Sequence, residues 1–161
     1  MELEILANGN LRIDDARIIF RNFSGAPTKF NSKGGSRDFA LVIPNEEIYD
    51  ALLRDKNSGG VAWNVKKLDT QDDQDPLMFL KVRVNFDGFR PPNVYLKTDG
   101  KKVKLDEESI DILDQVEIQR VDLDIRPFDG DVNGKPFRSA YLQSMCVTQD
   151  ITDRFADHYE D

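Results

Sequence analysis

The chain has 161 residues, of which 39% are hydrophobic and 32% are charged, and its formal net charge is −8. That length suits one domain with a buried core of its own. No apolar run is long enough to span a bilayer, the N-terminal MELEILANGN lacks the layout of a secretion signal, and the lone Cys146 cannot form an internal disulfide. We therefore expect a cytoplasmic protein, in which the apolar pattern around Cys146 predicts a buried, unreactive thiol.

Short strands dominate the pattern along the chain. Segments rich in β-branched and aromatic residues alternate between apolar and polar positions, as half-buried strands do. Turn residues separate these segments at 24–36, 56–60, 69–76, 87–92 and 99–102. The predicted strands cover residues 16–23, 37–43, 63–68, 79–86, 94–97, 116–125 and 140–147.

Two segments have helical spacing instead. The first begins after a plausible N-cap at Asn45 and would bury Ile48, Ala51 and Leu52. The second opens on the acidic residues 106–108 and would bury Ile110, Ile112 and Leu113. Many short antiparallel strands with two brief helices indicate a small β-barrel or β-sandwich. Since no repeat or low-complexity linker divides the chain, we expect one domain over residues 1–149, followed by an acidic tail at 150–161.

Charge is unevenly distributed along the chain. Residues 1–11 carry −2, residues 12–104 carry +4, and residues 105–161 carry −10. A mildly basic body with an acidic end is compatible with nucleic-acid binding despite the negative total.

The strand FLKVRVNF at 79–86 carries the best candidate binding face. Alternation puts Leu80, Val82, Val84 and Phe86 on the core side and Phe79, Lys81, Arg83 and Asn85 on the other. A ring, two cations and an amide on one face suit a groove that stacks bases and follows phosphates. The same alternation in strand 94–97 places Tyr95 and Lys97 on the outer side. In strand 37–43 it places Arg37 and Phe39 on one face. The alternative for Phe39 and Phe79 is burial in the core.

Two loops and a tryptophan add further candidates. The loop that contains Lys29, Phe30 and Lys33 combines cations and a ring with the mobile Gly34-Gly35 pair, although it is equally compatible with a solvated hairpin loop. The loop at 87–92 pairs Phe89 with Arg90. Trp63 lies close to Lys66 and Lys67, and its phase fits a core position as well as a stacking position.

Three segments carry a family resemblance. The first is 110–147, where two alternating apolar segments flank the polar turn DGDVNG at 129–134, a half-buried β-hairpin. The others are GVAWNVKKL at 60–68 and PPNVYL at 91–96. Together they resemble the bacteriophage-type single-stranded DNA-binding proteins. The resemblance implies an OB-fold-like antiparallel Greek-key barrel, monomeric or dimeric, that coats single-stranded DNA during phage replication and recombination. Related sequences carry more aromatics before the turn, which weakens the expectation that this hairpin stacks bases.

Chemistry other than binding finds little support. Asp129, Asp131 and Asn133 match half of a calcium loop, but the required twelfth position is Ala140. Asp122 and Asp124, considered as nuclease metal ligands, fit the wet face of a strand better. The only histidine, His158, is close to the C-terminus. We therefore predict no catalytic residue, metal or cofactor, and keep as the alternative function a protein–protein adaptor or virion component.

The acidic tail offers a possible regulatory segment. In the family it resembles, such a tail occupies the basic groove and recruits replication partners. Here that role would fall to Asp153, Phe155, Asp157, Tyr159, Glu160 and Asp161. The four-residue spacing of Ile151, Phe155 and Tyr159 also fits a short amphipathic helix docked on the barrel.

Deleting residues 152–161 tests the competition model. Tail carboxylates and DNA phosphates compete for the same cations, so the truncated chain should bind a single-stranded oligonucleotide more tightly than the full chain at low salt. Titration of both forms at about 20 mM and about 200 mM salt, by fluorescence anisotropy, measures the difference, since the Debye length changes about threefold over this range. Unchanged or weaker binding by the truncated chain contradicts the model.

Overall fold

The structure is a computed structural model that describes residues 1–29, 32–70 and 74–151. Within these ranges the chain is mainly β, and none of its helices is long and apolar enough to cross a membrane. The helices are α1 (Glu46–Arg54) and the 3₁₀-helix η1 (Ile110–Asp114). The strands are β1 (Glu2–Ile5), β2 (Leu11–Asp14), β3 (Ile18–Asn22), β4 (Arg37–Val42), β5 (Val65–Leu68), β6 (Leu77–Val84), β7 (Asn93–Thr98), β8 (Lys101–Leu105), β9 (Ile118–Val132) and β10 (Lys135–Gln149).

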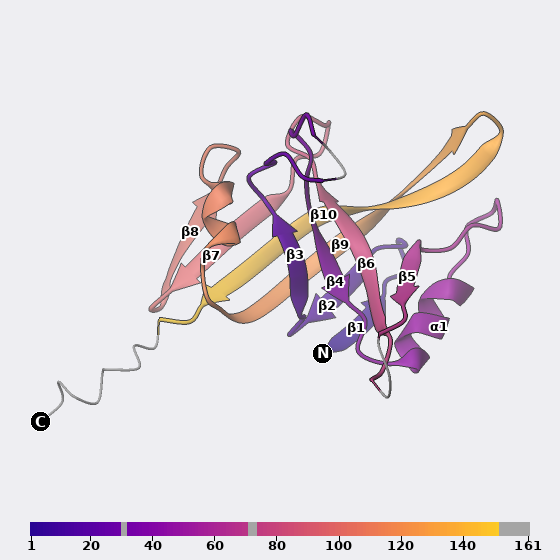
Figure 1. The fold of residues 1–161 in the computed structure, drawn as a ribbon, viewed down its shortest axis with the longest axis horizontal. Coiled ribbons are helices and arrows are strands. Elements are labelled where there is room, and N and C mark those ends of the chain that lie inside the picture. Colours follow the sequence, from indigo (N-terminus) through magenta and orange to yellow (C-terminus); the bar gives the residue numbers. More distant parts are fainter. Residues whose placement is uncertain (30–31, 71–73, 152–161) are drawn as a thin grey trace, which may run out of the picture.

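Strand β10 organises the sheet. One of its edges pairs antiparallel with β9, and the other pairs in parallel, first with β6 and then with β7. The order is β1-β2-β9-β10-β6-β4-β3, with β5 beside β6 and β8 beside β7. In Figure 1, β3, β4 and β6 lie side by side, with β7 and β8 at the end of β10 far from the hairpin tip. The mainly β, OB-like class is confirmed; among the described strands the sheet has two parallel pairings and does not close.

The core side of the sheet follows the predicted alternation. Leu80, Val82 and Val84 of β6 are buried, and Lys81 and Arg83 between them are exposed. On β7 the same alternation buries Val94 and Leu96. Burying such side chains contributes roughly 1.5–3 kcal/mol each, which holds β6 and β7 in register against the core.

The β9–β10 hairpin is longer than the sequence pattern predicts. Both strands have 15 residues and meet at a two-residue turn, Asn133-Gly134, where both φ angles are positive (53° and 81°). Positive φ at both positions suits a type I′ hairpin turn, which matches the twist of the strands. Residues 128–132 and 135–139 pair only with each other among the described strands, so this part of the hairpin, hereafter the arm, projects from the body (Figure 1).

The sequence pattern missed two short strands and part of a third. β1 and β2 were not predicted, and β8 falls partly on an expected loop at 99–102. Four of the five residues in β8 are exposed, so hydrophobic periodicity gives little signal there. β8 is held instead by its pairing with β7.

Both helices form where expected, but the second is a single short 3₁₀ turn. Asn45 caps α1 as predicted, because its side-chain oxygen accepts a 2.9 Å hydrogen bond from the backbone N–H of Ile48. In η1, Ile110 and Leu113 are buried. The expected burial of Ile112 is wrong, since i and i+3 residues share a face in a 3₁₀-helix and the intervening Ile112 is exposed.

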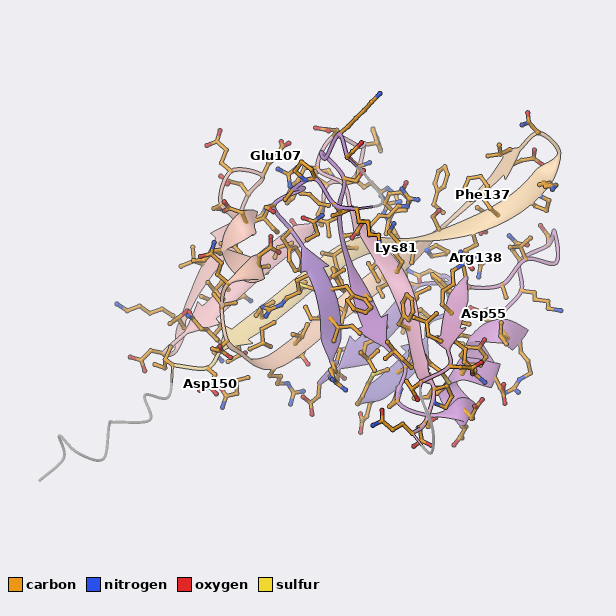
Figure 2. The ribbon with its side chains drawn as sticks, viewed as in Figure 1. Asp55, Lys81, Glu107, Phe137, Arg138 and Asp150 are labelled. Atoms are coloured by element: carbon orange, nitrogen blue, oxygen red, sulfur yellow. The ribbon has the colours of Figure 1, made fainter. Side chains whose placement is uncertain are left out.

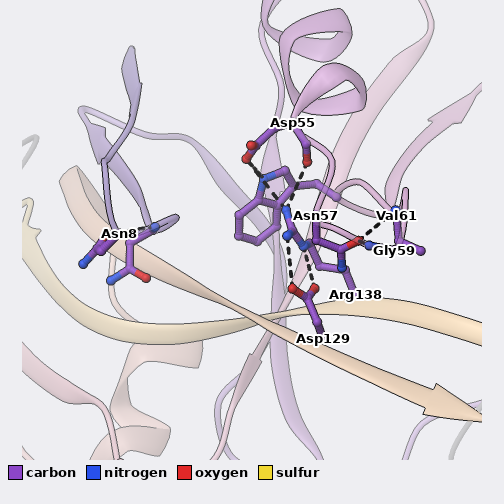
Figure 3. A network of polar contacts seen from close by, with 9 residues as sticks. Asn8, Asp55, Asn57, Gly59, Val61, Asp129 and Arg138 are labelled. Carbon is purple, nitrogen blue, oxygen red and sulfur yellow. Dashed lines mark hydrogen bonds and ion pairs between the residues drawn. The ribbon is translucent and has the colours of Figure 1, made fainter.

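A buried guanidinium ties the base of the arm to the body (Figure 3). Among the described residues, Arg138 is the one buried charged side chain. Its Nε and Nη2 donate to the two carboxylate oxygens of Asp129 at 2.7 and 3.2 Å, and its Nη1 donates to the backbone carbonyl of Asp55 at 3.1 Å. The guanidinium also stacks 5.0 Å from the ring of Trp63, whose Nε1 donates to Asp55 at 2.7 Å. This cluster, hereafter the clamp, joins the arm to the segment after α1.

The clamp also decides the role of Asp129, which is part of the half calcium loop noted in the sequence. The hydrogen bond from Arg138 lowers the pKa of Asp129 against the opposing effect of burial, and Asn57 adds a smaller lowering. Asp131 accepts a 2.8 Å hydrogen bond from the backbone N–H of Gly134 within the turn. Both carboxylates therefore have structural tasks in the hairpin.

Replacing Asp129 should destabilise the fold in a pH-dependent way. Asp129→Asn leaves a buried guanidinium with a weaker partner, so the free energy of unfolding should fall by about 1–3 kcal/mol at neutral pH. Because the folded-state pKa is lowered, the stabilisation is complete above the ordinary carboxyl pKa of 3.8 and disappears as pH falls through the lower folded value. Urea denaturation over a pH series should therefore show the two proteins converging in acid. The matched control is Asp111→Asn, at an exposed position of η1; an equal effect there would contradict the assignment.

Candidate nucleic-acid interface

Strand register places one row of polar and aromatic residues across the outer face of the sheet, the face opposite the core. Directly paired residues of neighbouring strands lie on the same face. The pairs are Asn22 with Asp38, Asp38 with Arg83, Arg83 with Tyr141, and Tyr141 with Arg126. Five strands (β3, β4, β6, β10 and β9) thus contribute one side chain each to a continuous row, in which Arg126 lies 5.1 Å from the ring centre of Tyr141.

A groove of about 1060 Å³ lies over this row. Its lining comes mainly from strands β3, β4 and β6 and from the loop before β4. Tyr141 of β10, Leu68 of β5 and Asp114 of η1 complete it. Four basic and two acidic side chains in the lining leave a net charge of +2 in a chain of −8. The basic ones are Arg21, Arg37, Lys81 and Arg83, and the acidic ones are Asp38 and Asp114.

Only part of this positive charge is available to a ligand. Arg21 donates to the carbonyls of Leu113 and Val116, both at 2.8 Å. Arg37 donates to the carbonyl of Phe23 at 2.9 Å and approaches Glu107 at 3.4 Å. These two arginines hold β3, β4 and η1 together. Lys81 and Arg83, in contrast, are exposed on the outer face of β6.

Aromatic side chains flank the groove at the β3 end. Phe20 is 62% exposed and meets Phe79 edge to face, with ring centres 6.0 Å apart. Its backbone has a φ of +53°, a conformation that L residues with bulky side chains rarely adopt. The β3–β4 register is also irregular between Ile19 and Asn22. Strained backbone that keeps a large ring in solvent is typical of functional sites.

A second group of rings covers the outer face of the arm. Phe128, Phe137 and Tyr141 lie on the same side of the hairpin by register, with ring centres 5.8 Å apart for Phe128–Tyr141 and 6.3 Å for Phe128–Phe137. A Cβ at Gly130 would lie 2.5 Å from the Phe137 ring, so the glycine gives that ring its place over β9. In Figure 2, Phe137 lies on the arm and Lys81 on the body. The rings of the arm thus extend the row beyond Tyr141.

Two predicted stacking residues are in fact core residues. The ring of Phe39 is 1% exposed and stacks on Phe23 with ring centres 5.3 Å apart. Its partner on β6 is the buried Val82, so both lie on the core side of the sheet. Trp63 is 2% exposed and belongs to the clamp. As accessible stacking surfaces both predictions are wrong, because tertiary packing covers the rings.

Other predicted residues, except for Arg37, lie away from the groove lining. Lys67 bonds Glu46 of α1 at 2.9 Å and lies over the ring of Tyr49, and the bond to Glu46 raises the pKa of Lys67. Tyr95 and Lys97 point outward as predicted, but Tyr95 packs against Lys102 and lines a separate hollow with Asp122 and Asp124. Arg37 lines the groove, but it lies on the core side of β4 opposite Val84, and Phe23 and Glu107 hold its guanidinium. These residues therefore do not form one accessible cationic surface with Lys81 and Arg83.

The remaining predicted residues are exposed near the groove or fall outside the description. Lys66 pairs with Phe79 and is exposed on the same face. Lys29 and Lys33 are exposed in the loop before β4, and Phe89, 98% exposed, and Arg90 are in the loop after β6. Phe30 and the tail residues Asp153, Phe155, Asp157, Tyr159, Glu160 and Asp161 lie outside the described residues.

The hollow around Tyr95 has an acidic lining. Arg120 bonds Asp122 at 3.1 Å, and Ser144 donates to Asp124 at 2.9 Å. Burial raises the pKa of Asp122, but hydrogen bonds from Arg120 and from the backbone of Asp15 reverse this, and the net shift is downward. Cys146 is half-buried beside them rather than fully buried, since its partners on β9 and β7 are Asp122 and Tyr95. Paired charges on a wet strand face account for these aspartates.

Sequence reasoning missed Phe20, Phe128, Phe137 and Tyr141. For Tyr141 a signal was present, because it separates two apolar residues, Ala140 and Leu142, that alternation would place inside. Phe20 carried no such signal, because it lies in a short run of apolar residues. The irregular backbone at this position is not visible in a local sequence pattern.

Comparisons with known proteins bear on this surface. A model of the phage ssDNA-binding domain family matches residues 3–161. A search of curated proteins finds no match. The C-terminally truncated single-stranded DNA-binding protein from bacteriophage Enc34 is structurally similar, with a TM-score of 0.55 and 15% identity over 92% of this chain and 90% of that one. The Enc34 protein in complex with ssDNA gives 0.53 and 13% over 94% and 93%. At such identities the structural likeness establishes the fold.

The strain at Phe20 can be tested without any ligand. Phe20→Ala and Phe20→Gly both remove the ring, but only glycine relieves the positive φ. The glycine variant should therefore be the more stable of the two by about 1 kcal/mol, the reverse of the usual order in a strand. Chemical denaturation measures the difference. The same pair of substitutions at Ile19, whose φ is not positive, should show the usual order; an alanine variant of Phe20 at least as stable as the glycine variant would rule out strain.

Proposed function

Because the chain belongs to the phage ssDNA-binding domain family, we propose that it holds single-stranded DNA along the outer face of its sheet, from the groove to the arm. The observation that carries this assignment is the continuous row Asp38–Arg83–Tyr141–Arg126, with exposed rings at both of its ends. A cationic surface interleaved with accessible rings is the usual solution for binding a strand of any sequence.

The two kinds of side chain have different tasks. Lys81, Arg83 and Lys66 attract the phosphates, while the loop cations Lys29, Lys33 and Arg90 extend the positive field beyond the groove. Unpaired bases stack on rings that are exposed or half-buried, each stacked base contributing about 1–3 kcal/mol whatever its identity. The rings proposed for stacking are Phe20, Phe79, Phe89, Phe128, Phe137 and Tyr141.

Selection of single strands follows from the stacking surface. In a duplex the faces of the bases are covered by their neighbours, so flat rings gain nothing from it, whereas a single strand can offer each base. The Enc34 protein, which shares this fold, is named as a single-stranded DNA-binding protein, and one of its structures holds ssDNA. That likeness supports the same class of ligand here.

The biological role we propose is passive. The chain coats and protects single-stranded DNA during phage replication and recombination, as a binding protein rather than an enzyme, in the cytoplasm of the bacterial host. Residues 1–149 form the binding domain. Residues 150–161 form an acidic tail that contacts replication or recombination proteins. This division rests on the concentration of acidic residues at the end of the chain.

Two substitutions should separate phosphate contacts from stacking. Arg83→Met should weaken binding and reduce the slope of log affinity against log salt by about 0.7, the value for one phosphate of a single strand. Tyr141→Ala should cost about 1–3 kcal/mol of binding free energy and leave the slope unchanged. Anisotropy of a labelled dT oligonucleotide at several salt concentrations measures both. Because Trp63 is buried in the clamp, its fluorescence is a poor direct reporter.

The control for this experiment is Lys101→Met, which removes an exposed charge on β8 outside the groove. It should change the affinity less than Arg83→Met. Equal effects of the two variants would show that the strand does not follow the groove. A wild-type chain without saturable, salt-sensitive binding would favour the adaptor function instead.

A further inference from the structure

A carboxylate is one member of the proposed binding row. Asp38 of β4 is directly paired with Arg83 of β6. Lys81 lies two residues before Arg83 on the same face of β6, and its Nζ is 3.5 Å from Asp38 Oδ2. The side chain of Asp38 is 23% exposed and that of Lys81 is 58% exposed. The acid therefore lies deeper in the groove than the ammonium group it holds.

The fold gives no structural reason for this acid. The other carboxylate in the groove lining, Asp114, accepts hydrogen bonds from the backbone N–H groups of Phe23 and Ser24 at 2.7 and 3.0 Å. Asp38 receives no comparable backbone hydrogen bond from any described residue, and its contact is the exposed Lys81. An ion pair as exposed as this one contributes little to stability, about 0–1 kcal/mol.

We propose that Asp38 is an internal counter-ion of the groove, which occupies Lys81 in the free protein and competes with DNA phosphate for it. The inference rests on the proposed function. A phosphate that reaches Lys81 must replace the carboxylate, and it then lies close to a like charge. Lys81 accordingly contributes less to affinity than its position suggests, while Arg83, which forms no ion pair within the described chain, carries the main phosphate contact.

Such a counter-ion limits affinity and eases release. A protein that coats a template must leave it again when a polymerase or a pairing partner advances. A carboxylate next to the departing phosphate offers Lys81 a replacement partner at once. It also adds repulsion while the strand is bound, so Asp38 should accelerate dissociation more than it slows association.

The decisive experiment compares Asp38→Asn with the wild-type chain. Asparagine keeps the shape and removes the charge, so the freed Lys81 should add one phosphate contact. We expect a dT oligonucleotide to bind about fivefold more tightly at 0.1 M salt, with a slope of log affinity against log salt steeper by about 0.7. Most of the gain should appear as slower dissociation in stopped-flow displacement.

A matched control and a double-mutant cycle locate the effect. Asp99→Asn removes the same charge at an exposed, positive-φ turn residue between β7 and β8, where asparagine is well tolerated, and should leave affinity nearly unchanged. Lys81→Met should weaken binding more in the Asp38→Asn background than in the wild type. Thermal melting of each variant confirms that it is folded.

The outcomes separate this inference from the function on which it rests. Equal effects of Asp38→Asn and Asp99→Asn would reduce the result to net charge and overturn the inference. Unchanged or weaker binding by Asp38→Asn, with wild-type binding intact, would also overturn it and leave the proposed function standing. If the wild-type chain itself does not bind the oligonucleotide, the proposed function fails instead.

Discussion

The double pairing of β10 is the constraint on which the rest of the structure depends. Its backbone hydrogen-bonds to β9 on one edge and to β6 and then β7 on the other, so a single strand fixes the relative register of the sheet. Because paired residues share a face, this register puts Arg83, Tyr141 and Arg126 next to one another although they are far apart in the sequence. Before its pairing with β6, at residues 135–139, β10 pairs with β9 alone, and this part of the two strands is the arm. Body and arm therefore share one outer surface.

The basic side chains of this molecule fall into two groups: some hold elements of the fold together, and others face solvent. Arg21, Arg37 and Arg138 are bound to carbonyls and carboxylates of neighbouring elements. Each such guanidinium satisfies several acceptors at once, which suits a partly buried joint between strands. Lys81 and Arg83 differ because strand alternation turns them away from the core. The positive groove is thus a local property, compatible with an anionic chain whose acids are mostly elsewhere.

The sequence predicted the outer face of β6 correctly, and it predicted the rings poorly. Alternation fixes the side of each residue relative to its immediate neighbours, which is why Phe79, Lys81 and Arg83 were placed as the structure has them. Phe39 and Trp63 were offered as stacking surfaces because an aromatic near cations looks the same whether its ring faces water or the core. The exposed ring of Phe20 depends on a positive φ, and the half-buried ring of Phe137 lies over a glycine of the opposite strand. Neither condition is visible in a local pattern.

The amino-acid sequence by itself determined the mainly β class, the hairpin with its Asn133-Gly134 turn, the N-cap of α1 and the phase of β6. These features depend on residues within a few positions of one another, where turn chemistry and alternation act. Only the tertiary structure decided which cations are free, which rings are buried and where the groove lies. Those properties depend on pairings such as Arg83 with Tyr141 and Arg138 with Asp55, between segments more than 50 residues apart. Local physical chemistry cannot specify such contacts, since they exist only once the strands have been brought into register.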